Sequence, residues 1–376
     1  MFVYVSNSDF VGGPDGKDPR DAVSVFDLDA ETGALNHVQT FGDMRSPTYM
    51  GRNPKHPVLY VTERWINGDK STPTPEQMNH DGVASLVIDP VSGTLSWGSR
   101  HTTDGQSPMH LSVNPEGNYL FAANPGRPKD PDPTEGHTTV LRLGADGLPC
   151  EVTHSVHYDC IPPLWRERPK TYPHAAFGDP EHKRIFVPHL MSDQVLIYDF
   201  NSDAGTLKTS RQPYVNVNSG AGPRHIAFHP SGRYFYVVNY YDATLAVFSY
   251  DKATGLASIV QTASVHPDGF KGVKDISHAL VSATGNFLYC SHRIHNSIAV
   301  FAINPETGEL KLSNRFEVGE RPRDFALSPS GRMMVVTNQA ANEIASFHVD
   351  SIKGGLKSTG HLVSTFSPNC VVFGLW

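Results

Sequence analysis

Three short motifs recur along the 376-residue chain, and their number constrains the fold more than any other feature. The first motif is a small or polar residue, then a proline, then an apolar segment. Its copies, 46 to 65 residues apart, begin at Ser46-Pro47, Ser107-Pro108, Tyr172-Pro173, Gly222-Pro223, Arg321-Pro322 and Ser367-Pro368, with Asp275-Ile276 in the remaining slot. Seven copies spread over the chain indicate a repeat architecture.

The second motif is a turn in which glycine precedes an apolar residue, as in "DAETGAL" and "NPETGEL". It also has seven copies, with glycines at Gly33, Gly93, Gly147, Gly205, Gly255, Gly308 and Gly355. Glycine at this point suits a hairpin loop that contains one residue at positive φ. The motif therefore predicts one hairpin in every repeat.

The third motif is a turn between two apolar segments, as in "PSGRYFY", and it occurs only six times. The missing copy coincides with the two ends of the chain. The chain ends in "NCVVFGLW", which reads as a first strand, and begins with "FVYVSNS", which reads as a second strand. We therefore expect one repeat to be completed by both ends of the chain.

Each repeat reads as four short strands, for example "HIAFH", "YFYVVN", "TLAVFSYD" and "SIVQTA" in the fourth complete unit. Apolar residues alternate or run together as in strands, and helical periodicity is nowhere sustained. Seven units of four strands predict an all-β, seven-bladed β-propeller that spans residues 1–376 as one domain. A solenoid or two β domains would not explain why the missing turn falls at the chain ends.

Composition narrows the location and the partners. A net charge of -7 argues against nucleic acid and against anionic membranes as partners. No apolar run approaches the roughly 20 residues of a membrane span, and the first residues read as a strand, not a signal peptide. We expect a cytoplasmic protein, a monomer or weak homo-oligomer. We also expect its four cysteines (Cys150, Cys160, Cys290 and Cys370) to be buried free thiols.

Three Pro-rich stretches exceed the repeat template, at residues 65–82, 125–137 and 157–171. Long loops of this kind either cover a functional site or decorate the surface. The sequence does not choose between these two roles.

Polar residues collect where a propeller would bring strands to its axis. We call the proline of the first motif, or Ile276 in the repeat that lacks it, the anchor position. The residues after each anchor position are Thr48, Met109, His174, Arg224, Ser277, Arg323 and Asn369, followed by Tyr49, His110, Ala175, His225, His278, Asp324 and Cys370. The ends of the second strands add Asn7, Glu63-Arg64, Asn124, His189, Asn239-Tyr240, His292-Arg293 and Asn338. So many histidines and arginines indicate a wet or ligand-filled channel.

Three of these residues, His174, Arg224 and Arg293, form the strongest candidate site. Two guanidinium groups near one axis repel each other and attract an anion. For His225 we expect a structural role, because strand alternation would turn it away from the face that Arg224 uses. A zinc site made of His110, His174 and His278 is a weaker alternative, and the cationic surroundings disfavour Ca²⁺ and Mg²⁺.

The stretches "GPRHIAFHPSGRYFYVVN", "YPHAAFGDP", "CSHRIHNSIAVFAINPETGEL" and "RPRDFALSPSGR" resemble the seven-bladed lactonase propeller family. That family includes 6-phosphogluconolactonases of the propeller type and carboxymuconate lactonising enzymes. The resemblance implies that His174, Arg224 and Arg293 form the site. It also implies a glutamate after Asn239, where this chain has Tyr240. Glu63, Asp242 and Asp324 are candidates to replace that carboxylate.

We therefore expect a hydrolase that opens a lactone of a sugar or small hydroxy acid, without a cofactor. His174 would act as general base, Arg224 would stabilise the oxyanion and Arg293 would bind a substrate anion. Further substrate-binding candidates are Asn239, Tyr240, His110, His278, His292, Arg323 and Glu63. The alternatives are a cycloisomerase or lyase that uses the same groups, and a non-catalytic propeller that binds a protein or metabolite.

Overall fold

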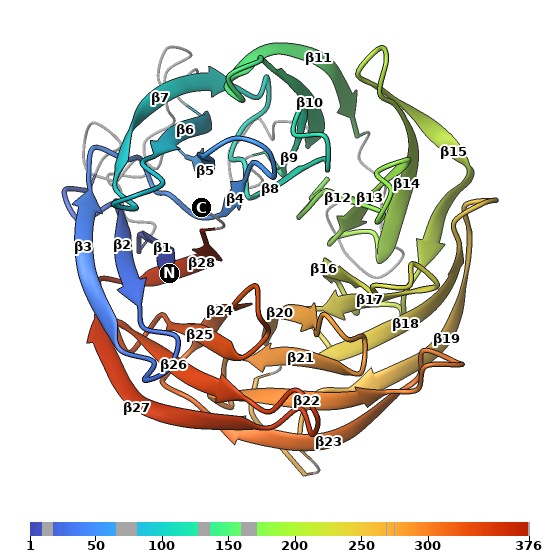
Figure 1. Cartoon of the computed structure of the whole chain (residues 1–376). Helices are drawn as coiled ribbons and strands as arrows, with labels where there is room; N and C mark the ends of the chain where they lie inside the picture. The colour runs from blue at the N-terminus through green and yellow to red at the C-terminus, as the bar shows by residue number, and fades with distance from the viewer. Residues whose placement is uncertain are drawn as a thin grey trace.

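The computed structural model describes residues 1–9, 18–64, 81–126, 136–158, 171–267, 269–273 and 275–374. These residues form seven four-stranded antiparallel sheets, the blades, arranged as a ring around a central axis (Figure 1). Most of each of the three long Pro-rich stretches lies outside the described residues. None of the described segments is a helix of the length and apolarity that a membrane span needs.

The first three complete blades follow one another along the chain. Blade 1 contains β4 (Met50–Arg52), β5 (Val58–Glu63), β6 (Gly82–Ile88) and β7 (Leu95–Thr102). Blade 2 contains β8 (His110–Val113), β9 (Tyr119–Asn124), β10 (His137–Leu143) and β11 (Pro149–His157). Blade 3 contains β12 (Phe177–Gly178), β13 (Arg184–His189), β14 (Gln194–Asn201) and β15 (Thr206–Asn216).

The next three blades repeat this order from the axis outward. Blade 4 contains β16 (Pro223–Phe228), β17 (Tyr234–Asn239), β18 (Thr244–Asp251) and β19 (Leu256–Ser264). Blade 5 contains β20 (Ile276–Val281), β21 (Phe287–His292), β22 (Ser297–Ile303) and β23 (Leu310–Glu317). Blade 6 contains β24 (Pro322–Leu327), β25 (Met333–Asn338), β26 (Glu343–Val349) and β27 (Leu356–Ser364).

The seventh blade joins the two ends of the chain. Its strand order is β28 (Pro368–Phe373), β1 (Phe2–Asn7), β2 (Ala22–Leu28) and β3 (Leu35–Phe41). The C-terminal strand β28 is innermost and pairs with β1 in a register that sets Val3 opposite Phe373 and Val5 opposite Val371. The sequence-based prediction of a blade split between the chain ends is therefore confirmed.

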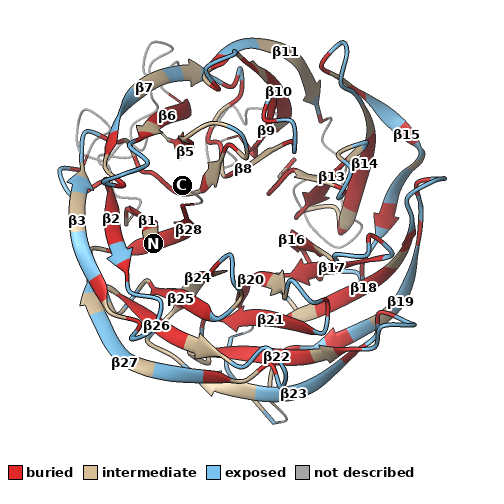
Figure 2. Cartoon of the chain, viewed as in Figure 1, coloured by how far each residue is buried: buried red, intermediate tan, exposed pale blue. Residues whose placement is uncertain are grey.

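The apolar core lies between neighbouring blades. Figure 2 shows buried residues on the inner strands of each blade and exposed residues on the outermost strands. Between blades 3 and 4, for example, Phe186 and Ile197 pack against Phe235 and Phe248. Because each blade buries apolar side chains against the next, neighbouring blades stabilise one another.

The repeated motifs join neighbouring blades through one recurring hydrogen bond. The second-strand tyrosines Tyr4 and Tyr236 each donate their hydroxyl to the carbonyl oxygen of a turn glycine in the next blade, Gly93 at 3.1 Å and Gly308 at 3.2 Å. Tyr60 makes the same bond to Gly147. In the seventh turn the residue at positive φ is Gly354, not Gly355 as the sequence indicated, because "DSIKGGL" offers two glycines and Gly354 is the one that bonds back to Asp350.

A β-bulge lies at the start of most innermost strands. In β16 the partner of Pro223 is Asn239 and the partner of His225 is Val238, so Arg224 is the extra residue. The same irregularity occurs in β20, β24 and β28. A bulge suspends strand alternation and re-aims side chains. In these four blades, two consecutive residues after the anchor can therefore both face the axis.

We predict that Gly33→Ala destabilises the protein by about 3 kcal/mol. Gly33 has φ of +80°, and a Cβ there would lie 2.4 Å from the Thr359 Cγ2 atom of blade 6. Left-handed backbone costs an alanine about 1–2 kcal/mol, and overpacking adds a similar amount. Gly220, also at φ +80° but with no atom within 4 Å, is the matched control, and Gly220→Ala should cost only about 1 kcal/mol.

The measurement is the urea midpoint and the calorimetric melting temperature of both variants. Equal losses for Gly33→Ala and Gly220→Ala would contradict the packing argument between blade 6 and the closing blade.

Candidate active site

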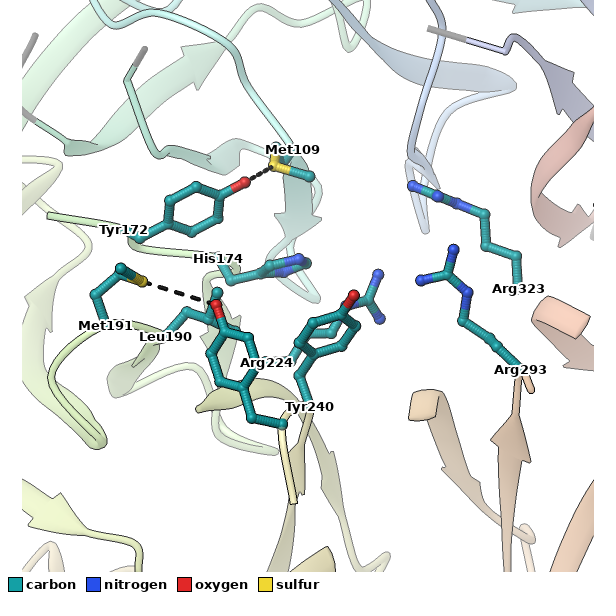
Figure 3. Close-up of a pocket in the computed structure, with 10 residues that line it drawn as sticks. Met109, Tyr172, His174, Leu190, Met191, Arg224, Tyr240, Arg293 and Arg323 are labelled. Atoms are coloured by element: carbon teal, nitrogen blue, oxygen red, sulfur yellow. Dashed lines mark hydrogen bonds between the residues drawn. The ribbon is translucent and has the colours of Figure 1, made fainter. Parts of the chain in front are cut away.

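A pocket of about 350 Å³ opens at the end of the ring where the innermost strands begin, which we call the anchor mouth. It is lined by Met109, Tyr172, His174, Leu190, Met191, Arg224, Tyr240, Tyr241, Arg293 and Arg323. Figure 3 shows the side chains of Arg293 and Arg323 on one side and those of Tyr172 and Met191 on the other. The three residues of the strongest candidate site, His174, Arg224 and Arg293, thus share one cavity, although the first and the last are 119 positions apart in sequence.

The anchor positions place the first set of pocket residues. His174 follows Pro173, which bridges to His189, and the His174 amide donates to the Pro188 carbonyl at 2.9 Å. Arg224 follows Pro223 at the bulge of β16, and its Nη1 donates to the carbonyl oxygen of Ser277 in the next blade. Both side chains are buried at 6–7% exposure.

A recurring backbone hydrogen bond places the second set. In blades 3 to 7, the residue just after the second strand donates its amide to the carbonyl of the residue before the anchor, as in Tyr240 to Gly222 at 2.8 Å and Arg293 to Asp275 at 2.8 Å. Leu190 bonds to Tyr172 in the same way at 2.9 Å. This bond turns the chain over the anchor mouth, so these side chains reach the pocket.

Five of the seven predicted substrate-binding residues lie outside this pocket, three of them at the ends of second strands. Asn239, His292 and Glu63 are the last residues of their strands, one position before the residues that the recurring bond turns inward. Asn239 Nδ2 donates to Thr244 Oγ1 at 3.0 Å, and Glu63 accepts from Arg100 Nε at 2.7 Å. Because successive side chains of a strand point to opposite sides, these residues serve contacts within or between blades.

The imidazole of His292 likewise makes its contacts outside the pocket. It packs against Phe270, with ring centroids 5.2 Å apart, and its Nδ1 accepts from the His295 amide at 3.2 Å. Position in the repeat could have separated the residues that line the pocket from those that do not. The residue that lines the pocket comes one place after the end of the second strand, and the last residue of the strand does not line it.

Histidines form a layer below the pocket. His225 lies among His110, His174 and His278, with ring centroids 5.4 to 5.5 Å apart. The Nδ1 atoms of His225 and His278 are 3.2 Å apart and share one hydrogen bond. His110 and His278, predicted to bind substrate, therefore lie beneath the pocket and do not line it.

The expectation that His225 turns away from the face of Arg224 is wrong. Both residues border the same small space at the axis, together with His174, Arg323 and Asp324. The physical reason is the bulge at Arg224, which breaks the alternation on which the expectation relied.

Electrostatically the pocket is one-sided. Arg224, Arg293 and Arg323 line it, and none of the described residues that line it is an aspartate or glutamate. Burial, reinforced by Arg293, lowers the pKa of Arg224 to about 10. Behind the lining, Asp275 Oδ1 lies 3.3 Å from Arg293 Nη1 and offsets one of these charges. The remaining positive charge favours an anionic ligand.

His174 is a neutral imidazole in this setting. Burial, together with the nearby cations Arg224 and Arg323, holds the pKa of His174 well below its usual range. Its Nδ1 is buried without a hydrogen-bond partner in the described part of the chain. In Figure 3 the ring points toward the side chain of Arg224. A neutral imidazole next to guanidinium donors can accept a proton from a bound water.

Except for Met109, which follows an anchor position, the residues of the opposite wall were not predicted from the sequence. The wall consists of Met109, Tyr172, Leu190, Met191 and Tyr241. The hydroxyl of Tyr172 lies 3.1 Å from Met109 Sδ, and the hydroxyl of Tyr241 lies 3.8 Å from Met191 Sδ. This wall therefore presents ring faces and thioethers, which suit the carbon skeleton of a small ligand. Leu190, Met191 and Tyr241 come one or two residues after the end of a second strand, and this position in the repeat could have predicted that they line the pocket.

Among the described residues, no group of three or more His, Cys, Asp or Glu side chains has the arrangement of a metal site. Cys290 and Cys370 are buried free thiols as expected, but Cys150 is exposed. Cys150 lies on β11, the outermost strand of its blade, where alternate side chains face solvent. Cys160 lies outside the described residues.

Comparison with known proteins gives consistent matches over most of the chain. The model of the family described as "Lactonase, 7-bladed beta-propeller" matches residues 10–373. The chain is 30% identical over 359 residues to the 6-phosphogluconolactonase of Bacillus subtilis (strain 168), covering 95% of both chains. It is 29% identical to the 6-phosphogluconolactonase of Serratia proteamaculans (strain 568), covering 89% of this chain and 90% of that one.

Among solved structures, the periplasmic gluconolactonase of Pseudomonas aeruginosa superposes with a TM-score of 0.85 at 25% identity, covering 99% of this chain and 98% of the other. Since that relative is named as periplasmic, the cytoplasmic location of this chain stays a prediction.

We predict that Asp275→Asn destabilises the protein by about 3 kcal/mol, because it leaves a buried guanidinium without its carboxylate. The control is Glu151→Gln, which breaks an exposed ion pair with Arg142 and should cost less than about 1 kcal/mol. Inorganic phosphate should restore part of the melting temperature of Asp275→Asn, because a bound anion replaces the lost charge. Equal effects of the two substitutions would contradict the electrostatic description of the pocket.

Proposed function

The chain belongs to the seven-bladed β-propeller lactonase family, and from this premise we propose that it hydrolyses the ring ester of a small anionic lactone in the pocket at the anchor mouth. The observation that carries the proposal is the convergence of His174 with Arg224, Arg293 and Arg323 in one pocket whose described lining has no carboxylate. This arrangement supplies a proton acceptor and positive charge at the same point.

Hydrolysis of a lactone needs an activated water and stabilisation of negative charge on the carbonyl oxygen. In the proposed reaction His174 accepts a proton as water attacks the carbonyl carbon. The bond between that carbon and the ring oxygen then breaks. The ring oxygen receives the proton back from His174, and the product is the open hydroxy acid. No cofactor takes part.

The arginines divide two tasks. Arg224 is fixed by the Ser277 carbonyl and lies beside His174, so it is assigned to the developing oxyanion. One such donor typically contributes roughly 3 kcal/mol to transition-state stabilisation. Arg293 and Arg323, on the far side of the pocket in Figure 3, are assigned to the phosphate or carboxylate of the substrate.

Tyr240 lines the pocket at the position where the resemblance implies a glutamate. A phenol hydrogen-bonds a substrate oxygen without adding a negative charge that would compete with the substrate anion. The replacement thus leaves His174 as the proton acceptor in this proposal, and Glu63, paired with Arg100, is not assigned a role in the reaction.

The first substrate to test is 6-phosphogluconolactone, since the sequence relatives carry that activity in their names. Turnover is followed as acid release above the spontaneous rate, with product analysis by NMR in oxygen-labelled water. Label in the carboxylate of the product supports hydrolysis. An unlabelled isomeric product would instead support a cycloisomerase, and no turnover across anionic and neutral lactones would support a non-catalytic binding propeller.

We predict that His174→Gln lowers kcat by about 10²- to 10⁴-fold, the usual contribution of a general base. The KM should change little, because the arginines that bind the anion remain. His361→Gln, on the exposed face of β27, is the matched control and should retain full activity. Unchanged kcat in a folded His174→Gln protein would remove His174 as the base.

We also predict an unusual pH dependence of kcat/KM. The pKa of His174 is lowered by burial and by Arg224, so the imidazole stays neutral and competent below pH 6.5. The activity of folded enzyme should therefore persist down to a pH well below 6.5. A carboxylate-bearing lactone avoids the second ionisation of a phosphate near pH 6. An acidic limb centred at 6.5 would contradict this prediction.

Below pH 6.5, the free energy of unfolding should decrease, although the activity of the folded enzyme persists. An unfolded histidine takes up a proton near pH 6.5, whereas His174, His110 and His225 have lowered pKa values in the fold. The unfolded state binds more protons below that pH, so stability falls as pH decreases. Circular dichroism at each pH separates this loss of fold from loss of catalysis.

A further inference from the structure

A second cavity, of about 440 Å³, lies at the opposite end of the channel, where the innermost strands end. We call this end the far mouth; residues around it include Arg52 of β4, Leu280 of β20, Leu327 of β24 and Phe373 of β28. None of its lining residues lines the pocket at the anchor mouth. Its volume falls within the range of small-molecule sites.

Three polar residues, Tyr49, His278 and Asp324, lie at the inner end of this cavity. Tyr49 and Asp324 also border the small space beneath the anchor-mouth pocket, so the layer to which they belong separates the two cavities. Tyr49 packs on His110 with ring centroids 4.3 Å apart. The Asp324 carboxylate accepts from the Val371 amide at 3.0 Å and lies 3.5 Å from His278 Nε2. The second cavity is therefore a separate compartment.

The walls of this cavity are mainly apolar. Leu280, Val281, Leu327 and Val372 line it and are only partly buried, and Phe325 and Phe373 add two aromatic rings. Covering partly exposed apolar surface with a hydrocarbon is favourable by roughly 25 cal/mol per Å². The walls thus favour a ligand with an apolar body.

One cation interrupts these apolar walls. The guanidinium of Arg52, the last residue of β4, makes no hydrogen bond or ion pair with any described residue, and its Nη1 is buried. Burial lowers the pKa of Arg52, and no neighbouring carboxylate opposes that effect. A buried donor without a partner costs free energy that a bound anion would recover. A carboxylate matches one guanidinium in a bidentate pair.

We propose that the far-mouth cavity binds an amphipathic carboxylate, with its head on Arg52 and its hydrocarbon body against Leu280, Leu327 and Phe373. This site is independent of the proposed hydrolysis, because it shares no lining residue with the pocket at the anchor mouth. The two ligands also differ in kind. Three arginines suit a strongly anionic polar group, whereas one arginine in an apolar cavity suits a monoanion with a hydrocarbon tail.

The experiment is calorimetric titration of the full chain with octanoate, and with acetate and 1-octanol as separate controls for the head and the tail. Octanoate should bind one to one and at least about tenfold more tightly than either control, since the site uses both parts. Absence of octanoate binding at millimolar concentration, or equal binding of acetate, would overturn the proposal.

Variants assign the binding to this cavity. Arg52→Gln should weaken octanoate binding about tenfold or more, Arg52→Lys should retain part of it, and Leu327→Gln should weaken it through the apolar wall. Arg293→Gln, in the other pocket, should bind octanoate as the natural chain does. Loss of binding in Arg293→Gln, with binding kept in Arg52→Gln, would place octanoate in the anchor-mouth pocket and refute the proposal.

Melting temperatures show whether each variant is folded, and Leu327→Gln tests the cavity even if an Arg52 variant is not. Lactone hydrolysis by Arg52→Gln without octanoate should equal that of the natural chain. A failure to bind octanoate would leave the proposed hydrolysis untouched, because that reaction is measured separately.

Discussion

Pairing of β28 with β1 is the interaction on which the rest of the structure depends. It joins residues 368–373 to residues 2–7 and closes seven blades into a ring. Without it, both strands would present open edges, and the seven innermost strands would have no common axis. The pocket exists only around that axis, because its lining comes from blades 2 to 6. The pocket and the arrangement of its side chains therefore depend on ring closure.

Within the closed ring, two local devices aim side chains at the axis. The bulge after the anchor position presents two consecutive residues, such as Arg224 and His225, to the channel. The recurring backbone bond after the second strand turns Tyr240 and Arg293 over the mouth. Because both devices repeat from blade to blade, a single substitution at either position changes the pocket without changing the fold. This separation allows Tyr240 to occupy the position where the resemblance implies a carboxylate.

The electrostatics of the channel change along its length. At the anchor mouth, three guanidinium groups surround the imidazole of His174. Burial and the nearby cations lower the pKa of this imidazole. Below these groups a layer of buried histidines and Tyr49 lies between this pocket and the far mouth. There the walls are apolar and Arg52 has no partner among the described residues. One channel thus offers two compartments of different chemistry.

The sequence by itself determined the number of blades, their strand order and the blade shared by the chain ends, because those features follow from repeated turns and alternating apolar residues. It also indicated His174, Arg224, Arg293, Tyr240 and Arg323, since repeat position predicts which strand ends meet at an axis. Only the tertiary structure decided which side of each strand end faces the pocket. It placed Asn239, His292 and Glu63 outside, turned His225 inward at a bulge, and assembled the methionine and tyrosine wall. The physical reason is that a shift of one residue reverses the direction of a side chain, and bulges and backbone bonds between strands set that shift.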